Sequence, residues 1–168
     1  DKHDYNNENY SNWNELKNAI VKNENPIIIL PLYLYDHSGI TISTTPFSCG
    51  WDSGQIGFIY ISQTEVDLLG CTINENESKS DYKKRLKSSL LREVKTYDNY
   101  ITGEVYGYQI EGNLCEDSCW GFYGDYEKSG LLDEAKSSID YAVQQSIEKK
   151  VLQTKSYIKN EIPLIYRS

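Results

Sequence analysis

The residues best suited to chemistry gather in one stretch of the chain, from Tyr35 to Gln55. His37 lies near its start, and Cys49 and Asp52 lie in its second half. An imidazole, a thiolate and a carboxylate can serve as base, nucleophile and orienting group in Cys–His catalysis, with Asp36 as the other candidate orienting carboxylate. Together with Cys119 they are also suitable ligands for Zn²⁺. The stretch therefore has two chemical interpretations, a Cys–His catalytic site or a zinc site with His37, Cys49 and Cys119 as metal ligands.

A structural role is the interpretation that the composition of this stretch favours. It holds three glycines together with Pro46, Phe47 and Trp51. Aromatic side chains can close the end of a sheet, glycines permit positive φ, and Asp36 and Asp52 can accept turn hydrogen bonds. The cysteine spacing does not decide between the roles. Cys115 and Cys119 have the spacing of paired zinc ligands, but no second close pair of Cys or His completes a finger.

Two later segments also place polar groups beside aromatic rings, at Tyr97–Asp98 and between Asp117 and Gly124. They border the first stretch if a strand predicted at 103–111 lies beside one predicted at 55–61. We then expect a paired site with His3 at its rim. The predicted binding residues are Asp36, His37, Trp51, Asp52, Gln55, Tyr97, Asp98, Asp117, Trp120 and Tyr123.

Hydrophobic periodicity predicts the elements that position these residues. Helices are expected from a Ser11 cap to about Lys22, at 63–69, from a Ser80 cap past Tyr97, and from Leu131 to about Lys159. Strands are expected at 27–35, 40–44, 55–61 and 103–111, whereas 114–124 reads as a loop. This order predicts the α+β class, with a small, mostly antiparallel sheet and packed helices, in a single domain over residues 1–168. Residues 1–10 are expected to be a surface segment.

The long C-terminal helix is expected to bury one apolar face. The residues assigned to that face are Leu132, Ala135, Ile139, Ala142, Val143, Ile147 and Val151.

Composition narrows the classes of function. The net charge of −8 and the pI of about 4.8 disfavour direct binding of nucleic acid and favour a basic partner. No apolar run approaches the ~20 residues that cross a bilayer, so we expect a cytoplasmic protein with reduced thiols. No phosphate-binding loop, zinc-protease or hydrolase-elbow motif occurs. The chain contains no Met, so we expect that residues preceding Asp1 are missing.

Several segments resemble a family of small proteins that phages, plasmids and bacteria carry. The resemblance rests on the residues of Leu30–Gly39, Phe47–Gln55, Ile59–Tyr60, Thr96–Gly103, Val105–Gly107 and Asp117–Gly124, supported by the opening Asp1–Asp4. It covers about residues 1–124, and the C-terminal helix departs from it. Members of the family carry a further strand-like stretch before this point. The family has no established activity, so the resemblance implies a setting rather than a mechanism.

That setting, together with the acidic charge, suggests an inhibitor of a bacterial defence nuclease such as Cas9, in the manner of anti-CRISPR proteins. Carboxylates would stand in for phosphates against the basic surface of the target. The candidate contacts are Glu65, Asp67, Glu75, Glu77, Asp133, Glu134, Asp140 and Glu148. A bound metal would brace the loops. The alternative is a hydrolase or nucleic-acid-modifying enzyme that uses the cluster of His37, Cys49, Asp52 and Cys119.

Overall fold

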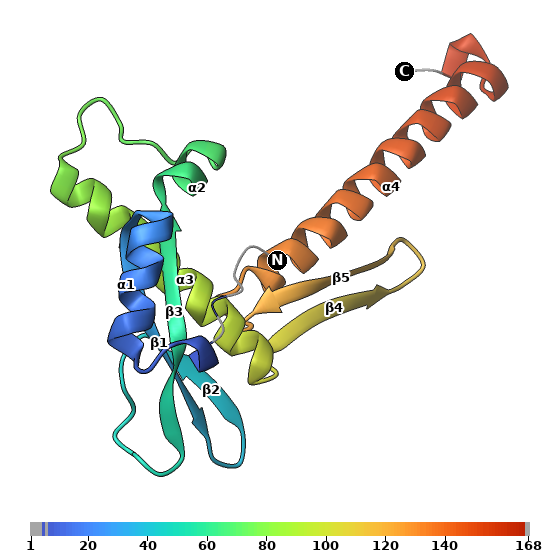
Figure 1. Cartoon of the computed structure of the whole chain (residues 1–168). Coiled ribbons are helices and arrows are strands. Elements are labelled where there is room, and N and C mark those ends of the chain that lie inside the picture. The colour runs from blue at the N-terminus through green and yellow to red at the C-terminus, as the bar shows by residue number, and fades with distance from the viewer. Residues whose placement is uncertain (1–4, 6, 167–168) are drawn as a thin grey trace. The chain divides into compact units, whose positions relative to one another are not determined.

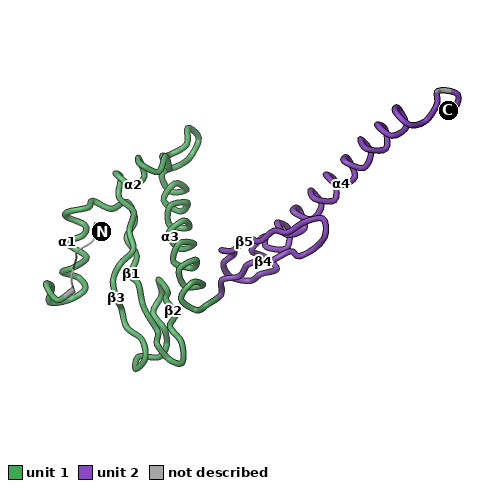
Figure 2. The backbone as a smooth tube through the Cα atoms, turned by 90° about the vertical axis from the view of Figure 1, so that its right-hand side faces the viewer, with its two compact units in different colours: residues 1–103 green, residues 104–168 purple. Residues whose placement is uncertain are grey.

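The computed structural model describes residue 5 and residues 7–166 and confirms the α+β class. Its strands form two small antiparallel sheets, and a long helix follows them (Figure 1). The chain divides into two compact units, residues 1–103 and residues 104–168 (Figure 2). The expectation that these units act as one domain stays a prediction. His3 and the rest of the opening segment Asp1–Asp4 lie outside the described residues.

The first unit is built on three strands in the order β2-β1-β3, all antiparallel. They are β1 (Pro26–Asp36), β2 (Ile40–Ser43) and β3 (Ser53–Ser62). The central strand tolerates Pro31 because β2 pairs with β1 only from Tyr33 onward. A register shift follows at Leu32/Tyr33, close to the irregularity that the proline predicts.

Four helical segments belong to this unit: η1 (Asn7–Asn9), α1 (Trp13–Glu24), α2 (Gln63–Leu68) and α3 (Lys79–Ile101). Successive side chains of a strand point to opposite faces. Ile59 and Ile61 of β3 pack with Leu90 of α3, whereas Phe58 meets Trp13 of α1 edge to face. The helices α1 and α3 therefore cover opposite faces of the sheet (Figure 2).

Two of the predicted N-cap residues are wrong. Asn12, rather than Ser11, accepts the hydrogen bond from the N–H of Glu15 at the start of α1. Ser78, rather than Ser80, caps α3 by accepting from the N–H of Asp81. In both cases the helix begins near the predicted residue, but the side chain that reaches the free N–H groups comes from a different position.

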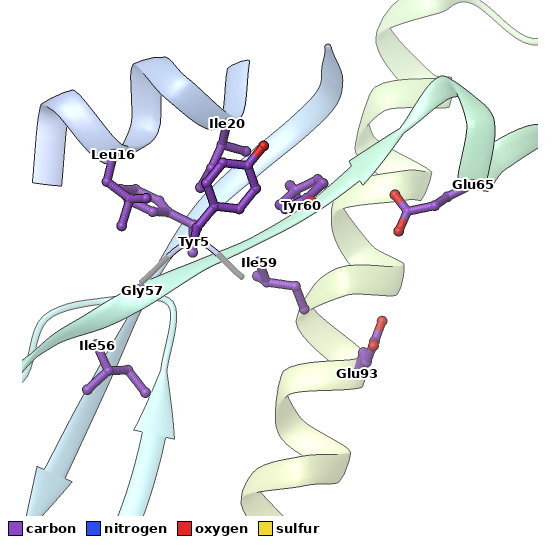
Figure 3. A pocket seen from close by; sticks show the side chains of 10 residues that line it. Tyr5, Leu16, Ile20, Ile56, Gly57, Ile59, Tyr60, Glu65 and Glu93 are labelled. Atoms are coloured by element: carbon purple, nitrogen blue, oxygen red, sulfur yellow. The ribbon is translucent and has the colours of Figure 1, made fainter. Parts of the chain in front are cut away.

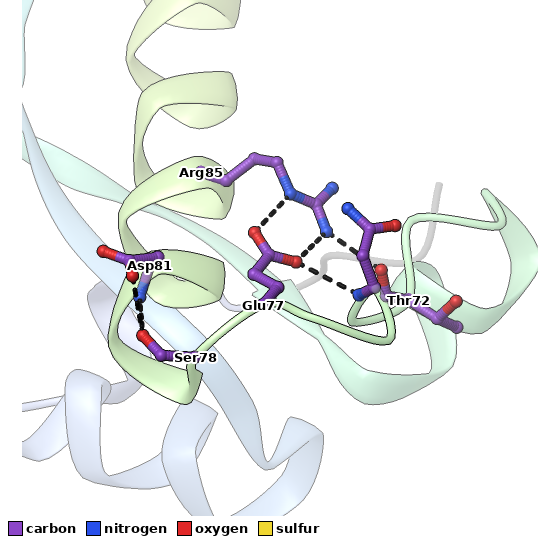
Figure 4. Close-up of polar contacts among 6 residues, drawn as sticks. Thr72, Glu77, Ser78, Asp81 and Arg85 are labelled. Atoms are coloured by element: carbon purple, nitrogen blue, oxygen red, sulfur yellow. Dashed lines mark hydrogen bonds and ion pairs between the residues drawn. The ribbon is translucent and has the colours of Figure 1, made fainter.

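The connector before α3 is held by an arginine clamp (Figure 4). Arg85 donates to both carboxylate oxygens of Glu77, at 2.9 and 2.8 Å, and to the carbonyl of Thr72 at 2.9 Å. The hydrogen bond from Arg85 is the main cause that lowers the pKa of Glu77. Glu77 is thus committed to its own chain and is not the free contact that the sequence suggested.

The second unit consists of an antiparallel hairpin and a long helix. Its elements are β4 (Val105–Glu111), β5 (Glu116–Tyr123), α4 (Leu131–Glu161) and η2 (Leu164–Tyr166). The predicted loop at 114–124 is wrong, because most of it pairs with β4 as strand β5. The condition that 103–111 lies beside 55–61 in a sheet is not met, since β4 pairs with β5 and β3 pairs with β1. The turn-forming residues of this segment led to the loop prediction, but pairing with β4 makes the segment a strand.

The predicted buried face of α4 is the largest error in the expected packing. Leu131 is the one residue of this helix that is buried, and the side chains of Leu132, Ile139, Val143, Ile147 and Val151 are exposed. The helix contacts β4 through its first half and extends well past the hairpin (Figure 2). Periodicity identified the helix and its apolar side, but the described residues provide no cover for that side.

No helix among the described residues combines the length and apolar character needed to cross a bilayer.

Candidate functional site

The structure brings His37, Asp52 and Cys49 together at one end of the three-stranded sheet. His37 lies in the turn between β1 and β2, and the other two lie in the loop between β2 and β3 (Figure 1). The Nδ1 atom of His37 is 3.1 Å from Oδ2 of Asp52. The thiol of Cys49 donates to the same oxygen at 3.7 Å. The sequence thus identified three residues that do meet in space.

Backbone contacts and stacked rings hold this end of the sheet in place. The N–H of Asp36 donates to the carbonyl of Asp52 at 2.8 Å, and the hydroxyl of Ser53 donates to the carbonyl of Cys49. The ring of Tyr35 stacks on His37 at 6.0 Å and on Phe47 at 5.5 Å between ring centres. The loop is therefore ordered by its own interactions, as the structural interpretation expects.

The order of the three groups does not match Cys–His catalysis. In that chemistry the imidazole lies between the thiol and the carboxylate, so that it can remove the proton from sulfur. Here the carboxylate of Asp52 lies between the other two, and the thiol donates to it. The imidazole is also largely exposed, at 64% of its side-chain surface. The arrangement fits a hydrogen-bonded surface turn better than a nucleophile with its base.

The zinc interpretation receives no support from the described residues. Cys119 lies on β5 in the second unit, whereas His37 and Cys49 lie in the first. The part of the chain that the structure describes holds no set of three His, Cys, Asp or Glu side chains placed to bind a metal ion. All four cysteine thiols are free.

Trp51 is the most conspicuous residue of this loop, because 97% of its surface is exposed. Large apolar side chains gain nothing from that position in the isolated protein. Its neighbour Asp52 is fixed by His37, so the backbone on which Trp51 stands is ordered. Gln55 is turned toward its own strand, where its amide donates to the carbonyl of Gly57 at 3.2 Å.

Asp98 is a structural residue in this arrangement. Its Oδ1 accepts from the hydroxyl of Thr41 at 2.5 Å and from the N–H of Ile42 at 3.0 Å, and its Oδ2 pairs with Lys95 at 3.0 Å. Burial would raise the pKa of Asp98, but these hydrogen bonds outweigh it and hold the pKa below the usual value. The carboxylate thus joins α3 to β2. Its neighbour Tyr97 is exposed and stacks on Tyr100.

Asp117 of the second unit has a comparable role. It accepts from the hydroxyl of Ser138 on α4 at 2.7 Å and from the hydroxyl of Tyr108 on β4 at 3.2 Å. The hydrogen bond from Ser138 is the largest cause that lowers the pKa of Asp117. This carboxylate joins the hairpin to α4, so its oxygens are occupied by its own unit.

The two remaining aromatic candidates, Trp120 and Tyr123, are exposed on β5. Trp120 lies across from Gly107, and a Cβ at Gly107 would collide with its ring and approach the carbonyl of Cys119 to 2.7 Å. Gly107 is therefore required for the ring to lie flat on the hairpin. Whether this surface joins the loop at 35–55 in a paired site stays a prediction, because the two belong to different units.

The proposed acidic contacts divide into engaged and available groups. Glu65 closes the capping box of α2 with Ser62, and Glu77 is held by Arg85. Asp67 and Glu148 each accept from a glutamine on their own helix. The side chains of Glu75, Asp133, Glu134 and Asp140 are exposed and free of hydrogen bonds and ion pairs within the described residues.

A groove of about 620 Å³ beside β3 is a site that sequence reasoning missed. Leu16 and Ile20 of α1 line it on one side of β3, residues 56–60 of β3 lie between, and Glu65 and Glu93 bring carboxylates on the other side (Figure 3). Burial, followed by the negative charges of nearby Glu24 and Glu65, raises the pKa of Tyr60 to about 12. The groove therefore suits a cationic group on an aliphatic stem.

The hydrogen-bond partners that sequence reasoning missed lie far along the chain from the residues that they contact. Thr41 reaches Asp98 across 57 positions, and Ser138 reaches Asp117 across 21. Only the pairing of Lys95 with Asp98, three positions apart on a helix, was accessible to local pattern reasoning.

Comparison with known proteins identifies no relative: no family model, curated protein or solved structure matches this chain.

Proposed function

We propose that this chain is a binding protein that inhibits a bacterial defence nuclease, such as Cas9, by occupying its basic surface in the bacterial cytoplasm. The observation that carries the proposal is Trp51, which is almost completely exposed on an ordered loop. Tryptophan is the residue type most enriched among the anchors of protein interfaces, and an ordered loop lowers the entropic cost of binding.

Charge supports a basic partner for this anchor. Asp36 and Asp52 lie beside Trp51 in the same end of the sheet. The groove beside β3 adds the carboxylate of Glu93, and the whole chain carries a net charge of −8. We expect a lysine or arginine side chain of the partner to bind beside β3, with its charge near Glu65 and Glu93. Such a surface competes with nucleic acid for the same basic residues.

The enzyme alternative is less well supported, because Asp52 rather than His37 accepts the hydrogen bond from the thiol of Cys49. Two single variants separate the hypotheses. Cys49→Ala removes only a half-exposed thiol contact, so an inhibitor that still folds retains its binding. His37→Ala frees Asp52, so in an inhibitor it weakens binding only as far as the loop that carries Trp51 loosens. An enzyme that depends on either residue loses turnover while its stability persists.

The direct test uses the purified full chain and guide-loaded Cas9, followed by other nucleases of the bacterium that carries the gene. We expect association by interferometry, slower DNA cleavage, and weaker binding as salt increases. Trp51→Ala should weaken binding about tenfold or more, as hot-spot truncations do.

The matched control is Leu69→Ala, which removes another exposed apolar side chain beyond the opposite end of β3. The proposal is wrong if no such nuclease is bound or slowed. It is also wrong if Trp51→Ala and Leu69→Ala bind as tightly as the parent.

A further inference from the structure

No burial of side chains accounts for the helical conformation of the C-terminal half of α4. Every residue from Ile147 to Glu161 is exposed. This part includes the β-branched residues Ile147, Val151 and Ile158, which lower helix propensity. Isolated helices of about this length are marginal in water, and packing of an apolar face is what usually stabilises them. A partner for this face would supply that packing.

Six of the nine exposed apolar side chains of α4 form one continuous stripe. They are Leu132, Ile139, Val143, Ile147, Val151 and Ile158, each between 39% and 51% exposed. Val143 follows Leu132 by eleven positions, and Ile158 follows Ile147 by eleven. Eleven residues correspond to three helical turns, so these side chains stay on one side of a nearly straight helix.

The stripe is separate from the side of α4 that faces the hairpin. Leu131, Ala135, Ser138 and Ala142 are the buried or half-buried residues of its first half, and Ser138 is bonded to Asp117 of β5. Lys136, Asp140 and Lys150 also fall within the stripe. The aliphatic stems of the lysines can cover apolar neighbours while the ammonium groups reach water.

The distribution of charge along α4 indicates which kind of partner can pack against the stripe. The first half, to Gln145, has three acidic residues and one lysine, whereas the second half has four lysines and two glutamates. A second α4 lying antiparallel places each acidic half against a basic half. A parallel second copy would place like charges together. The charges of α4 therefore favour antiparallel pairing with the α4 of a second copy.

We propose that this chain forms a homodimer in which the apolar stripe of α4 packs antiparallel against the same stripe of a second copy. Leu132 of one copy then lies near Ile158 of the other, and Val143 lies near Ile147. Asp133 and Lys155 are 22 positions apart, two eleven-residue repeats, and so lie on the same edge of the stripe. In a two-fold antiparallel pair, that edge faces itself, and Asp133 meets the Lys155 of the other copy twice.

This inference does not rest on the proposed function, because it concerns assembly of the chain with itself. The first test measures the mass of the full chain by light scattering and sedimentation over a range of concentrations. We expect a dimer. Ile147→Glu should give a monomer, whereas Leu152→Glu, which adds the same charge on the opposite side of α4, should remain dimeric. Circular dichroism establishes that both variants keep their fold.

Charge exchange tests the direction of pairing. Asp133→Lys should raise the dimer dissociation constant about tenfold, since two attractive pairs become repulsive. Glu134→Lys is the matched control, because it makes the same change in the same first turn but away from the stripe. The double variant Asp133→Lys, Lys155→Asp should restore the dimer.

A monomer at high micromolar concentration overturns the proposal, including the case in which the stripe is covered within one chain or by a different protein. A dimer that Leu152→Glu weakens as strongly as Ile147→Glu also overturns it. A dimer insensitive to the single charge change, with no rescue by the double variant, refutes the antiparallel arrangement.

Discussion

Replacement of Asp98 should destabilise the first unit rather than remove a binding contact. Only 11% of its side chain is exposed, and its oxygens receive the hydroxyl of Thr41, the N–H of Ile42 and the ammonium of Lys95. Hydrogen bonds to a charged group contribute about 1.5–3 kcal/mol each, partly offset by the cost of burying the carboxylate. We therefore expect Asp98→Ala to lower the free energy of unfolding by about 3 kcal/mol, in line with breaking a buried ionic contact.

The asparagine variant separates geometry from charge. An amide oxygen can still accept from Thr41 and Ile42, but it loses the ion pair with Lys95, whose ammonium is mostly solvated. Asp98→Asn should therefore cost about 1 kcal/mol. Tyr97→Ala, which alters the exposed neighbour on the same helix, is the control and should change stability by less than about 0.5 kcal/mol.

Urea unfolding followed by tryptophan fluorescence can measure these differences in the full chain. With Trp120 replaced by Phe, the signal comes from the first unit, where Trp13 packs against Phe58. The reasoning is refuted if Asp98→Ala unfolds at the same urea concentration as the parent. It is refuted more directly if that variant keeps its stability and loses binding to a partner, because Asp98 would then be the binding residue that its sequence context suggested.

The dependence on pH follows from the lowered pKa of Asp98. Its pKa in the folded state lies below the ordinary value of 3.8, so the folded state holds its proton less tightly than the unfolded state. The stabilisation is complete above the unfolded pKa and is lost as the pH falls through the folded pKa. The difference in stability between the parent and Asp98→Asn should accordingly shrink on acidification below pH ~4. A difference that grows on acidification would contradict this sign.

Three further changes test the remaining local structure. Ser62→Ala removes the cap of α2 and should lower the free energy of unfolding by about 1 kcal/mol in urea, whereas Ser62→Thr should largely retain it. Arg85→Met removes the hydrogen bonds to Glu77 and should speed hydrogen exchange and proteolysis in the connector before α3. Arg85→Lys should give intermediate rates. Unchanged exchange would show that the clamp does not order the connector. Gly107→Ala should displace the ring of Trp120 and shift its emission without altering the first unit, and an unshifted spectrum would contradict the close approach.

Much of the local structure was predictable from short-range patterns. Apolar periodicity located the helices that became α1, α3 and α4, and alternation located the strands of the first unit. The helix predicted at 63–69 matches α2, which Ser62 caps and which ends shortly before Gly70, with φ of 65°. Residue types also singled out the loop at 35–55, where His37, Asp52 and Cys49 do come together.

The roles of those residues depended on the tertiary structure. Asp98 and Asp117 read as binding residues, yet each is occupied by partners from another element. Strand β5 read as a loop, because its small and turn-forming residues become a strand only when β4 lies beside them. Residue type alone does not reveal that the carboxylate of Asp52, rather than the imidazole of His37, lies in the middle of the cluster.

The sequence by itself determined where the candidate residues gather along the chain, where the helices lie to within a few positions and that α4 has an apolar side, since these follow from neighbours within a few positions. Only the tertiary structure decided that Asp98 is buried against Thr41, that Trp51 faces solvent and that the stripe of α4 has no cover among the described residues. Burial and hydrogen bonding depend on which distant segments come together when the chain folds, so one residue type can be either buried or exposed.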